Sequence, residues 1–129
     1  KPAVCRAFVE LLDLYPTLST LCGLEVEERL QGKDVSKMLD DPEHAVREAA
    51  FCVAPMRKGF LVREDEWAYI QYGEKAENGI ELFDMKKDPK QYANLAKKKK
   101  YQPILKDFKI KLSDKLAEVR ANDLRSKPL

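Results

Sequence analysis

The chain has 129 residues, a length for one domain or for one domain with a piece of another attached. Because 44% of its residues are hydrophobic and 36% are charged, it can bury a core and is not a disordered polymer. Its formal net charge at pH 7 is only +2. No apolar run approaches the ~20 residues that span a bilayer, and the N-terminus lacks the apolar centre of a signal peptide. The sequence therefore predicts a soluble chain, and any export signal would lie upstream of Lys1.

The charge is distributed unevenly. Residues 1–50 contain 6 basic and 10 acidic side chains, a balance of −4, so residues 51–129 carry +6. The densest basic run is Lys97 to Lys100, a pattern that nucleic-acid and acidic-lipid binders share. Because no aromatic residues alternate with these lysines to stack on bases, we favour a solvated helix start. A stand-alone lysine-rich binding module for nucleic acid or acidic lipid remains the alternative.

Cysteine and histidine are too sparse for a disulfide framework or a zinc site. The three cysteines, Cys5, Cys22 and Cys52, lie far apart between apolar neighbours, which is typical of buried small hydrophobic residues. The single histidine, His44, lies in a charged stretch, where we expect a surface position.

The first predicted elements are a strand and a short helix. Residues 8–12 form an apolar run, and Asp13 is a suitable N-cap for a helix over residues 14–22. Gly23 supplies the left-handed residue that ends such a helix. The apolar residues on one face of this helix are Leu14, Leu18, Leu21 and Cys22.

A charged and irregular connection follows over residues 24–48. It contains one predicted helical turn at residues 35–39 and a second helix start at residues 40–42. Its weak apolar periodicity is typical of a linker that lies over a surface. We place a domain boundary near Arg47.

A small antiparallel sheet is predicted next. Its strands are residues 49–54, 59–64, 67–72 and 80–83. The turn Glu64-Asp65-Glu66 is short enough to join the second and third strands as a hairpin.

The clearest helix lies near the C-terminus. Its apolar residues recur every three or four positions, and we expect them to pack on a face of the sheet. They are Tyr101, Ile104, Leu105, Phe108, Leu112, Leu116 and Val119.

The segment between the last strand and this helix has an architectural interpretation. Asp88 is expected to cap a helical turn over residues 90–96, which tucks Tyr92 and Leu95 inward. A calcium site at Asp84 and Asp88 is disfavoured, because two carboxylates without further oxygen donors make a poor calcium loop.

Four segments resemble the sulfatases. Residues 81–96, ELFDMKKDPKQYANLA, resemble the C-terminal signature E-L-Y-D-L-x-x-D-P-x-E-x-x-N-L-A of that family. Residues 9–18, VELLDLYPTL, are similar to its V-x-L-x-D-L-x-P-T-L pattern, residues 31–35 to its Q-G-x-S/D-L step, and residues 62–70 to its V-R hairpin. Because the four occur in the right order, the chain resembles the C-terminal portion of a sulfatase, nearest to bacterial iduronate-sulfatase-like and arylsulfatase-like enzymes.

The resemblance implies an α+β fold in two parts. Residues 1–47 would be the last strand and helix of the alkaline-phosphatase-like α/β catalytic domain, with a linker. Residues 48–129 would be the sulfatase C-terminal subdomain, a four-stranded antiparallel sheet packed by a long helix.

The family's catalytic groups are expected to lie outside this chain. The resemblance implies a formylglycine, matured from the cysteine or serine of C/S-x-P/A-x-R, beside a calcium ion. After Cys52, the proline and the arginine each come one position too late for this motif. Sulfate ester hydrolysis needs an activated nucleophile, a cation and an acid for the leaving group. We predict no catalytic or metal-binding residue here, and no activity of this chain alone.

The predicted function is therefore that of scaffold and cleft wall in a sulfatase, a sulfuric ester hydrolase that acts on sulfated sugars. Its partners would be the catalytic domain and a sulfated carbohydrate, with no nucleic acid and no membrane. The resemblance implies that loops of this subdomain reach the rim of the cleft. Arg57 and Lys58, between the first two strands, are therefore the predicted substrate-binding residues, since their cations can pair with anionic groups of a sulfated sugar. A solvated hairpin loop is the alternative. The family also implies a periplasmic or extracellular location for the full-length protein.

Overall fold

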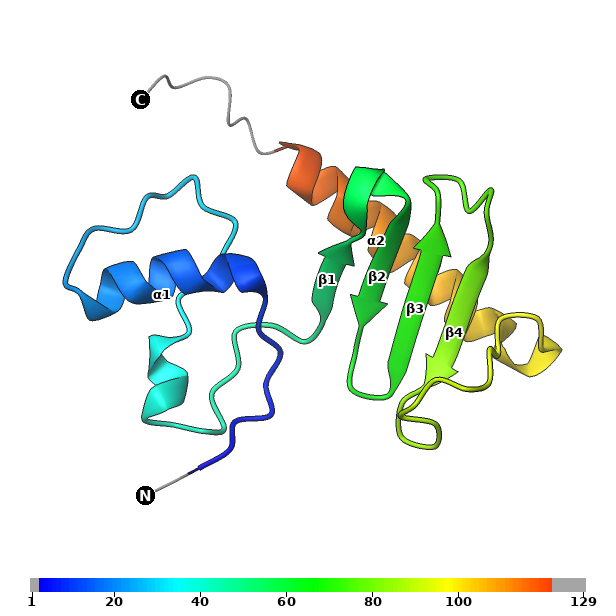
Figure 1. Cartoon of the computed structure of the whole chain (residues 1–129), viewed down its shortest axis with the longest axis horizontal. Helices are drawn as coiled ribbons and strands as arrows, with labels where there is room; N and C mark the ends of the chain where they lie inside the picture. Colours follow the sequence, from blue (N-terminus) through cyan, green and yellow to red (C-terminus); the bar gives the residue numbers. More distant parts are fainter. Residues whose placement is uncertain (1–2, 122–129) are drawn as a thin grey trace. The chain divides into compact units, whose positions relative to one another are not determined.

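The structure is a computed structural model that describes residues 3–121, apart from the side chain of Arg57. The chain forms two compact units (Figure 1). Of the described residues, unit 1 contains residues 3–48 and 117–121, and unit 2 consists of Ala49–Leu116.

Unit 2 is built on a four-stranded antiparallel sheet, in which each strand pairs with the next along the chain (Figure 1). The strands are β1 (Ala50–Val53), β2 (Gly59–Arg63), β3 (Trp67–Tyr72) and β4 (Ile80–Asp84). Phe51 lies opposite Val62, Val62 opposite Tyr69, and Tyr69 opposite Leu82, so these four side chains share one face. The four predicted strands and the hairpin are confirmed, and their ends agree to within one residue.

The long helix α2, Gln102–Ala121, covers that face of the sheet after the short 3-10 turn η4, Lys99–Tyr101 (Figure 1). The ring of Phe108 stacks on the ring of Tyr69, with 5.6 Å between the ring centroids. Each large apolar side chain buried in this way stabilises the fold by about 1.5–3 kcal/mol. The core side chains are Phe60, Val62, Tyr69, Leu82, Leu95, Leu105, Phe108 and Leu112. The predicted α+β fold and the packing of the helix on the sheet are thus confirmed.

A buried polar network extends from this core to the connection between β1 and β2. The hydroxyl of Tyr69 donates to Oε1 of Gln71 at 2.8 Å. Burial raises the pKa of Tyr69 to about 12, so the phenol remains a neutral donor. Nε2 of Gln71 donates to the carbonyls of Gly73 and Glu74, at 3.0 and 2.9 Å. The N–H of Gly73 donates to the carbonyl of Lys58 at 3.1 Å, which fixes the backbone of Lys58.

Unit 1 contains a short helix, α1 (Leu14–Leu21), directly after the 3-10 turn η1 (Leu11–Asp13). Gly23 has a φ of +69°, and the N–H of Leu24 donates to the carbonyl of Ser19 at 2.9 Å. This geometry is the glycine stop that the sequence predicts.

Two predicted elements of unit 1 are wrong. Residues 8–10 belong to no strand, and residues 11–13 form η1. A strand needs a neighbour for its backbone hydrogen bonds, and the described residues of unit 1 offer none. The helix start predicted at residues 40–42 is a turn, in which Oδ1 of Asp41 accepts the N–H of Glu43 at 3.0 Å. The helical turn predicted nearby is confirmed as η2, Ser36–Leu39.

Asp13 connects the segments of unit 1, and its side chain makes no capping bond to α1. The buried carboxylate accepts the backbone N–H groups of Glu10 and Lys33, at 2.7 and 2.8 Å. The guanidinium of Arg47 donates to both of its oxygens, with 2.6 Å between Nη2 and Oδ1. Burial raises the pKa of Asp13, but the hydrogen bonds from Arg47 and the two amides outweigh burial and hold this pKa below its usual value.

We predict that Asp13→Asn destabilises unit 1 by about 3 kcal/mol at pH 7, because the guanidinium of Arg47 stays buried without its counter-charge. Since the folded-state pKa of Asp13 lies below the unfolded-state value, its stabilisation is present above pH ~4 and is lost as the pH falls through the folded-state pKa. Hydrogen exchange of the amides of residues 10–35, corrected for intrinsic rates, measures both effects. The exposed Asp40→Asn is the control. Equal protection of Asp13→Asn and wild type at pH 7 would contradict this role.

We predict that Gln71→Ala lowers the free energy of unfolding of unit 2 by about 3 kcal/mol, because it leaves the buried hydroxyl of Tyr69 without its acceptor and removes the hydrogen bonds from Nε2 to the carbonyls of Gly73 and Glu74. Urea unfolding followed by the fluorescence of Trp67 measures this change. The matched control is Tyr72→Phe, which removes only an exposed hydrogen bond to Glu81. A similar small loss in both variants would show that the network does not stabilise the unit.

Candidate functional site

The predicted substrate-binding residues lie in the connection between β1 and β2. Most of this connection is the 3-10 turn η3, Pro55–Arg57. Met56 has a φ of +59° and a ψ of +23°, a left-handed conformation that residues other than glycine seldom adopt. The N–H of Ala54 donates to the carbonyl of Gly59 at 2.8 Å and closes the loop. The connection is therefore a tight turn with a defined backbone conformation.

Lys58 follows η3 directly and is exposed. Among the residues that the structure describes, no carboxylate forms an ion pair with its ammonium. The side chain of Arg57 lies outside the described part of the chain. The loop thus presents the Lys58 ammonium on a backbone that the core holds in place, and such a cation can pair with a sulfate or a carboxylate.

Gln71 supports this loop from beneath, a role that the sequence prediction does not include. The signal was present in the strand pattern, because Gln71 falls on the same face of β3 as Trp67 and Tyr69. A glutamine on the inward face of a strand must find hydrogen-bond partners, and a carbonyl-rich turn at the strand end supplies them. The turn at Met56 has no comparable signal in the sequence.

The carboxylates of Asp84, the last residue of β4, and of Asp88 accept hydrogen bonds from their own segment. Oδ1 of Asp84 accepts the N–H groups of Lys86 and Lys87, at 3.2 and 3.0 Å, and its Oδ2 lies 3.0 Å from Nζ of Lys87. The hydrogen bond from the Lys87 side chain is the main cause that lowers the pKa of Asp84. Oδ2 of Asp88 accepts the N–H of Ala93 at 2.8 Å. These contacts agree with the predicted architectural role.

The helical turn predicted in this segment is wrong. Gln91 has a φ of +59°, which interrupts helical geometry. The N–H of Leu95 donates to the carbonyl of Leu82 at 2.8 Å, while the N–H of Leu82 donates to Oδ1 of Asn94 at 3.1 Å. The segment therefore runs along β4. This path buries Leu95, as predicted, but leaves Tyr92 82% exposed, contrary to the prediction.

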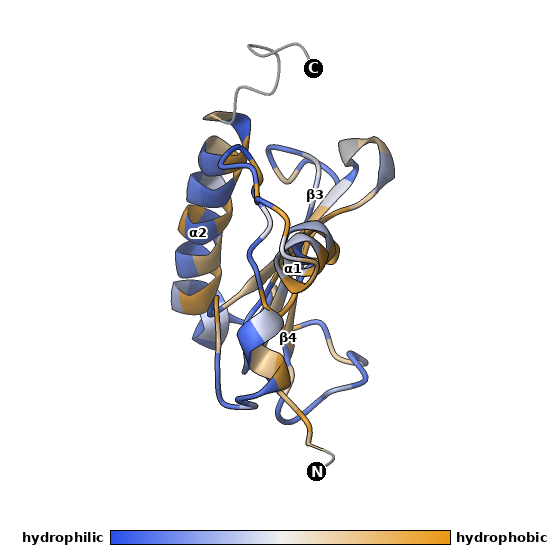
Figure 2. Ribbon diagram, turned by 90° about the vertical axis from the view of Figure 1, so that its left-hand side faces the viewer, coloured by the Kyte–Doolittle hydropathy of each residue, from blue (hydrophilic) through white to orange (hydrophobic). Residues whose placement is uncertain are grey.

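Helix α1 exposes an apolar face, which Figure 2 shows in orange. The opposite side faces the chain of unit 1, where the hydroxyl of Thr17 donates to the carbonyl of Asp13 at 2.6 Å and accepts the N–H of Val35 at 3.0 Å. We call the exposed set the α1 apolar face. It consists of Leu11, Leu14, Tyr15, Leu18 and Leu21, each more than half exposed. Within the described residues, nothing covers it.

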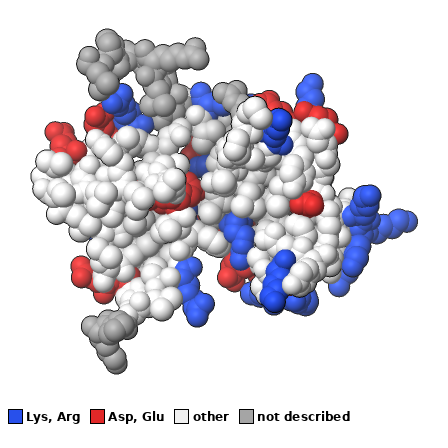
Figure 3. Space-filling model, in the orientation of Figure 1, with Lys and Arg blue, Asp and Glu red and all other residues white. Residues whose placement is uncertain are grey.

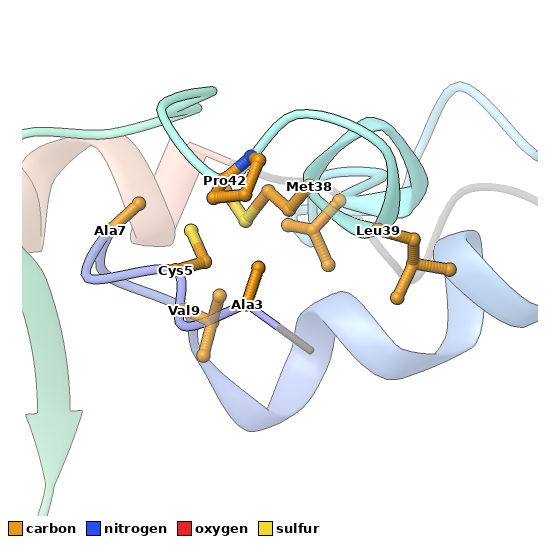
Figure 4. Close-up of a pocket in the computed structure, with 8 residues that line it drawn as sticks. Ala3, Cys5, Ala7, Val9, Met38, Leu39 and Pro42 are labelled. Atoms are coloured by element: carbon orange, nitrogen blue, oxygen red, sulfur yellow. The ribbon is translucent and has the colours of Figure 1, made fainter. Parts of the chain in front are cut away.

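A depression of about 440 Å³ lies elsewhere in unit 1 (Figure 4). It is lined by Ala3, Cys5, Ala7, Val9, Val35, Met38, Leu39 and Pro42. This lining contains no charged side chain, so it provides no counter-charge for a sulfate group. The nearby His44 is partly buried, although the sequence predicts a surface position.

The cysteines differ from the prediction. Cys22 and Cys52 are exposed and Cys5 is partly buried, and all three are free thiols. Cys22 ends α1 beside its exposed apolar face, and Cys52 lies in the edge strand β1, so their apolar neighbours in sequence do not enclose them.

The described residues do not fit the calcium ion and the formylglycine that the sulfatase resemblance implies. Within residues 3–121, no three histidine, cysteine, aspartate or glutamate side chains come together as metal ligands. Cys52 lies in β1, without the motif for conversion to formylglycine. None of the helices in the described part of the chain has the length and apolar character needed to cross a membrane.

Comparisons with known proteins agree with the resemblance. The family model of the C-terminal region of N-sulphoglucosamine sulphohydrolase matches residues 1–120. The chain is 34% identical over 123 residues to Delta 4,5-hexuronate-2-O-sulfatase of Bacteroides thetaiotaomicron, covering 89% of this chain and 25% of that protein. It is 28% identical over 127 residues to the Ulvan-active sulfatase of Formosa agariphila, covering 92% and 24%.

The fold is also similar to that of solved sulfatases. The structure of a 2-O GAG sulfatase matches with a TM-score of 0.70 and 31% identity, over 90% of this chain and 26% of that one. The chain spans about a quarter of the length of the relatives it matches. From the family match over residues 1–120 and from the shared fold, we conclude that the chain belongs to the family of the C-terminal region of N-sulphoglucosamine sulphohydrolase, within the sulfatases.

Proposed function

We propose that this chain is the C-terminal scaffold of a sulfatase, a sulfuric ester hydrolase that acts on sulfated carbohydrates. Its relatives are named for action on a hexuronate 2-O-sulfate and on ulvan, which supports this substrate class. The same family membership gives no support to a stand-alone module for nucleic acid or acidic lipid. As the family resemblance implies, the full-length protein would work in the periplasm or outside the cell.

The observation that carries the proposal is the α1 apolar face. Burying one leucine side chain is worth about 1.5–3 kcal/mol, so a helix with three leucines in water forgoes a large stabilisation. Contiguous apolar patches of this kind usually mark a surface that another protein body covers. We assign that body to a catalytic domain on the N-terminal side, with residues 1–47 as the end of its α/β fold and residues 48–129 as a separate subdomain.

In this arrangement the chain supports the reaction without performing its chemistry. The catalytic domain would hold the formylglycine and the calcium ion, which together supply the nucleophile and the cation that stabilises the sulfuryl oxygens. The residues of this chain position that domain and line one wall of the cleft. We assign the wall to the β1–β2 connection, where Arg57 and Lys58 pair with anionic groups of the sugar.

The double substitution Leu14→Ser, Leu18→Ser tests the docking of α1. Both side chains are more than half exposed in the 129-residue chain, so its free energy of unfolding should fall by no more than about 2 kcal/mol. In the full-length protein the same change should cost about 4 kcal/mol or more, because two leucines leave an apolar interface. Denaturant unfolding of both proteins measures the difference, with the exposed Ile110→Ser as control. An equally small effect in both proteins would exclude the interface.

The double substitution Arg57→Ala, Lys58→Ala tests the cleft wall in the full-length protein. We expect KM for a sulfated disaccharide that carries a uronic acid to rise about tenfold while kcat changes little, since exposed charge pairs bind ground state and transition state alike. KM for a small aryl sulfate should not change. Lys37→Ala, Lys109→Ala is the charge-matched control. Unchanged KM values would exclude contact between these two side chains and the substrate. A wild-type protein that releases no sulfate would contradict the proposed sulfatase activity.

A further inference from the structure

The connection between β4 and α2 carries a dense group of lysines, which are among the blue side chains at the right-hand edge of unit 2 in Figure 3. Residues 85–106 contain eight lysines and one acidic residue, a charge of +7, although the whole chain carries +2. We call five exposed members of this group the lysine cluster. They are Lys90, Lys97, Lys98, Lys99 and Lys100.

The lysine cluster differs from other lysines of unit 2 because no carboxylate neutralises it. Lys86 lies 2.5 Å from Glu66, and Lys111 lies 2.7 Å from Glu64. In the described part of the chain, no carboxylate forms an ion pair with any member of the cluster. The Nζ of Lys100 lies 5.5 Å from the ring centroid of Tyr101, which leaves its charge intact. The cluster is therefore open to an external anion.

The positive charges of the cluster repel one another and the N-terminal end of α2 when no anion is bound. Four consecutive lysines, Lys97 to Lys100, repel one another, since their spacing is within the screening length of about 8 Å at physiological salt. They also lie just before and within the first turns leading into α2, where the helix dipole disfavours cations. A bound polyanion relieves both repulsions at once.

The backbone that carries the cluster is ordered by hydrogen bonds. The N–H of Leu95 donates to the carbonyl of Leu82 in β4, and the N–H of Lys98 donates to the carbonyl of Leu95 at 3.0 Å. The N–H of Tyr101 then donates to the carbonyl of Lys98 at 3.0 Å. Because this path is already fixed, binding there orders only the lysine side chains, which lowers the entropic cost of association.

We propose that the lysine cluster binds a sulfated polysaccharide chain. The cluster follows β4, which is the edge strand opposite β1. It is therefore a second candidate anion-binding surface, distinct from the β1–β2 connection. Repeated sulfates along a polymer match repeated ammonium groups, whereas a single anion gains little from any one exposed lysine. Sulfated carbohydrate is favoured over nucleic acid because no aromatic residue alternates with Lys97 to Lys100 to stack on bases. The inference rests on the proposed action on sulfated carbohydrates.

Binding of dextran sulfate to the full-length protein tests this inference. The triple substitution Lys97→Gln, Lys98→Gln, Lys99→Gln should weaken binding roughly tenfold at low salt. The slope of the logarithm of affinity against the logarithm of salt concentration should fall by about two, as expected from three lost contacts in counter-ion release. The charge-matched control Lys37→Gln, Lys75→Gln, Lys109→Gln should change binding less than about twofold. Hydrolysis of a small aryl sulfate should be the same in all three proteins.

The outcomes separate this inference from the proposed function, because binding is measured without turnover. Equal binding by wild type and the triple variant, or an equal loss in the charge-matched control, would overturn the inference. Tighter binding of a single-stranded oligonucleotide than of dextran sulfate of the same total charge would overturn the assignment to sulfated polysaccharide. Sulfate release without binding of dextran sulfate would overturn the inference and leave the proposed function supported. Binding of dextran sulfate without sulfate release would contradict only the proposed function.

Discussion

The packing of Tyr69 against Phe108 is the contact on which unit 2 depends. Its aromatic stack joins the sheet to α2, and Tyr69 has no exposed surface. The hydroxyl of the same residue begins the hydrogen-bond path through Gln71 to Lys58. On the other side, Tyr69 lies opposite Leu82, whose backbone holds the segment that leads to the lysine cluster. Tyr69 thus supports the β1–β2 connection through its side chain, and its strand pairs with the strand that holds the segment before the lysine cluster.

Unit 1 is organised in the opposite way, with polar groups inside and leucines outside. Asp13 and Thr17 are buried and make the contacts that close the unit, whereas the α1 apolar face is in water. A charge pair such as that of Asp13 and Arg47 is sensitive to the loss of one partner but adds little apolar burial. The unit therefore has a defined shape and an unsatisfied apolar surface, a combination suited to a piece that completes a larger body.

Local pattern was sufficient where neighbours in sequence are also neighbours in the fold. The strands around residues 59–72 and the stripe of α2 follow periods of 2 and 3.6, so the sequence predicts them almost to the residue. Prediction from local pattern fails where contacts between residues distant in the sequence determine the structure. The apparent strand at residues 8–12 lacks a partner, and the left-handed Gln91 has no sequence signal. The carboxylate of Asp13 is bound by Arg47, which lies 34 positions away in the sequence. The sequence predicts that Lys58 lies in the loop between the first two strands, but it does not predict that Gln71 supports this loop.

In residues 81–96, which resemble the C-terminal signature of the sulfatases, polar side chains bind the backbone of the same segment. Asp88 accepts the N–H of Ala93, and the side chain of Asn94 accepts the N–H groups of Leu82 and Ala96. An apolar side chain of similar size cannot make these bonds, and an unsatisfied amide beside the sheet costs about 1–3 kcal/mol. These polar residues therefore specify a path for the chain, and the path determines where the following lysines stand. A motif can in this way be characteristic of an enzyme family because its polar side chains fix the path of the backbone.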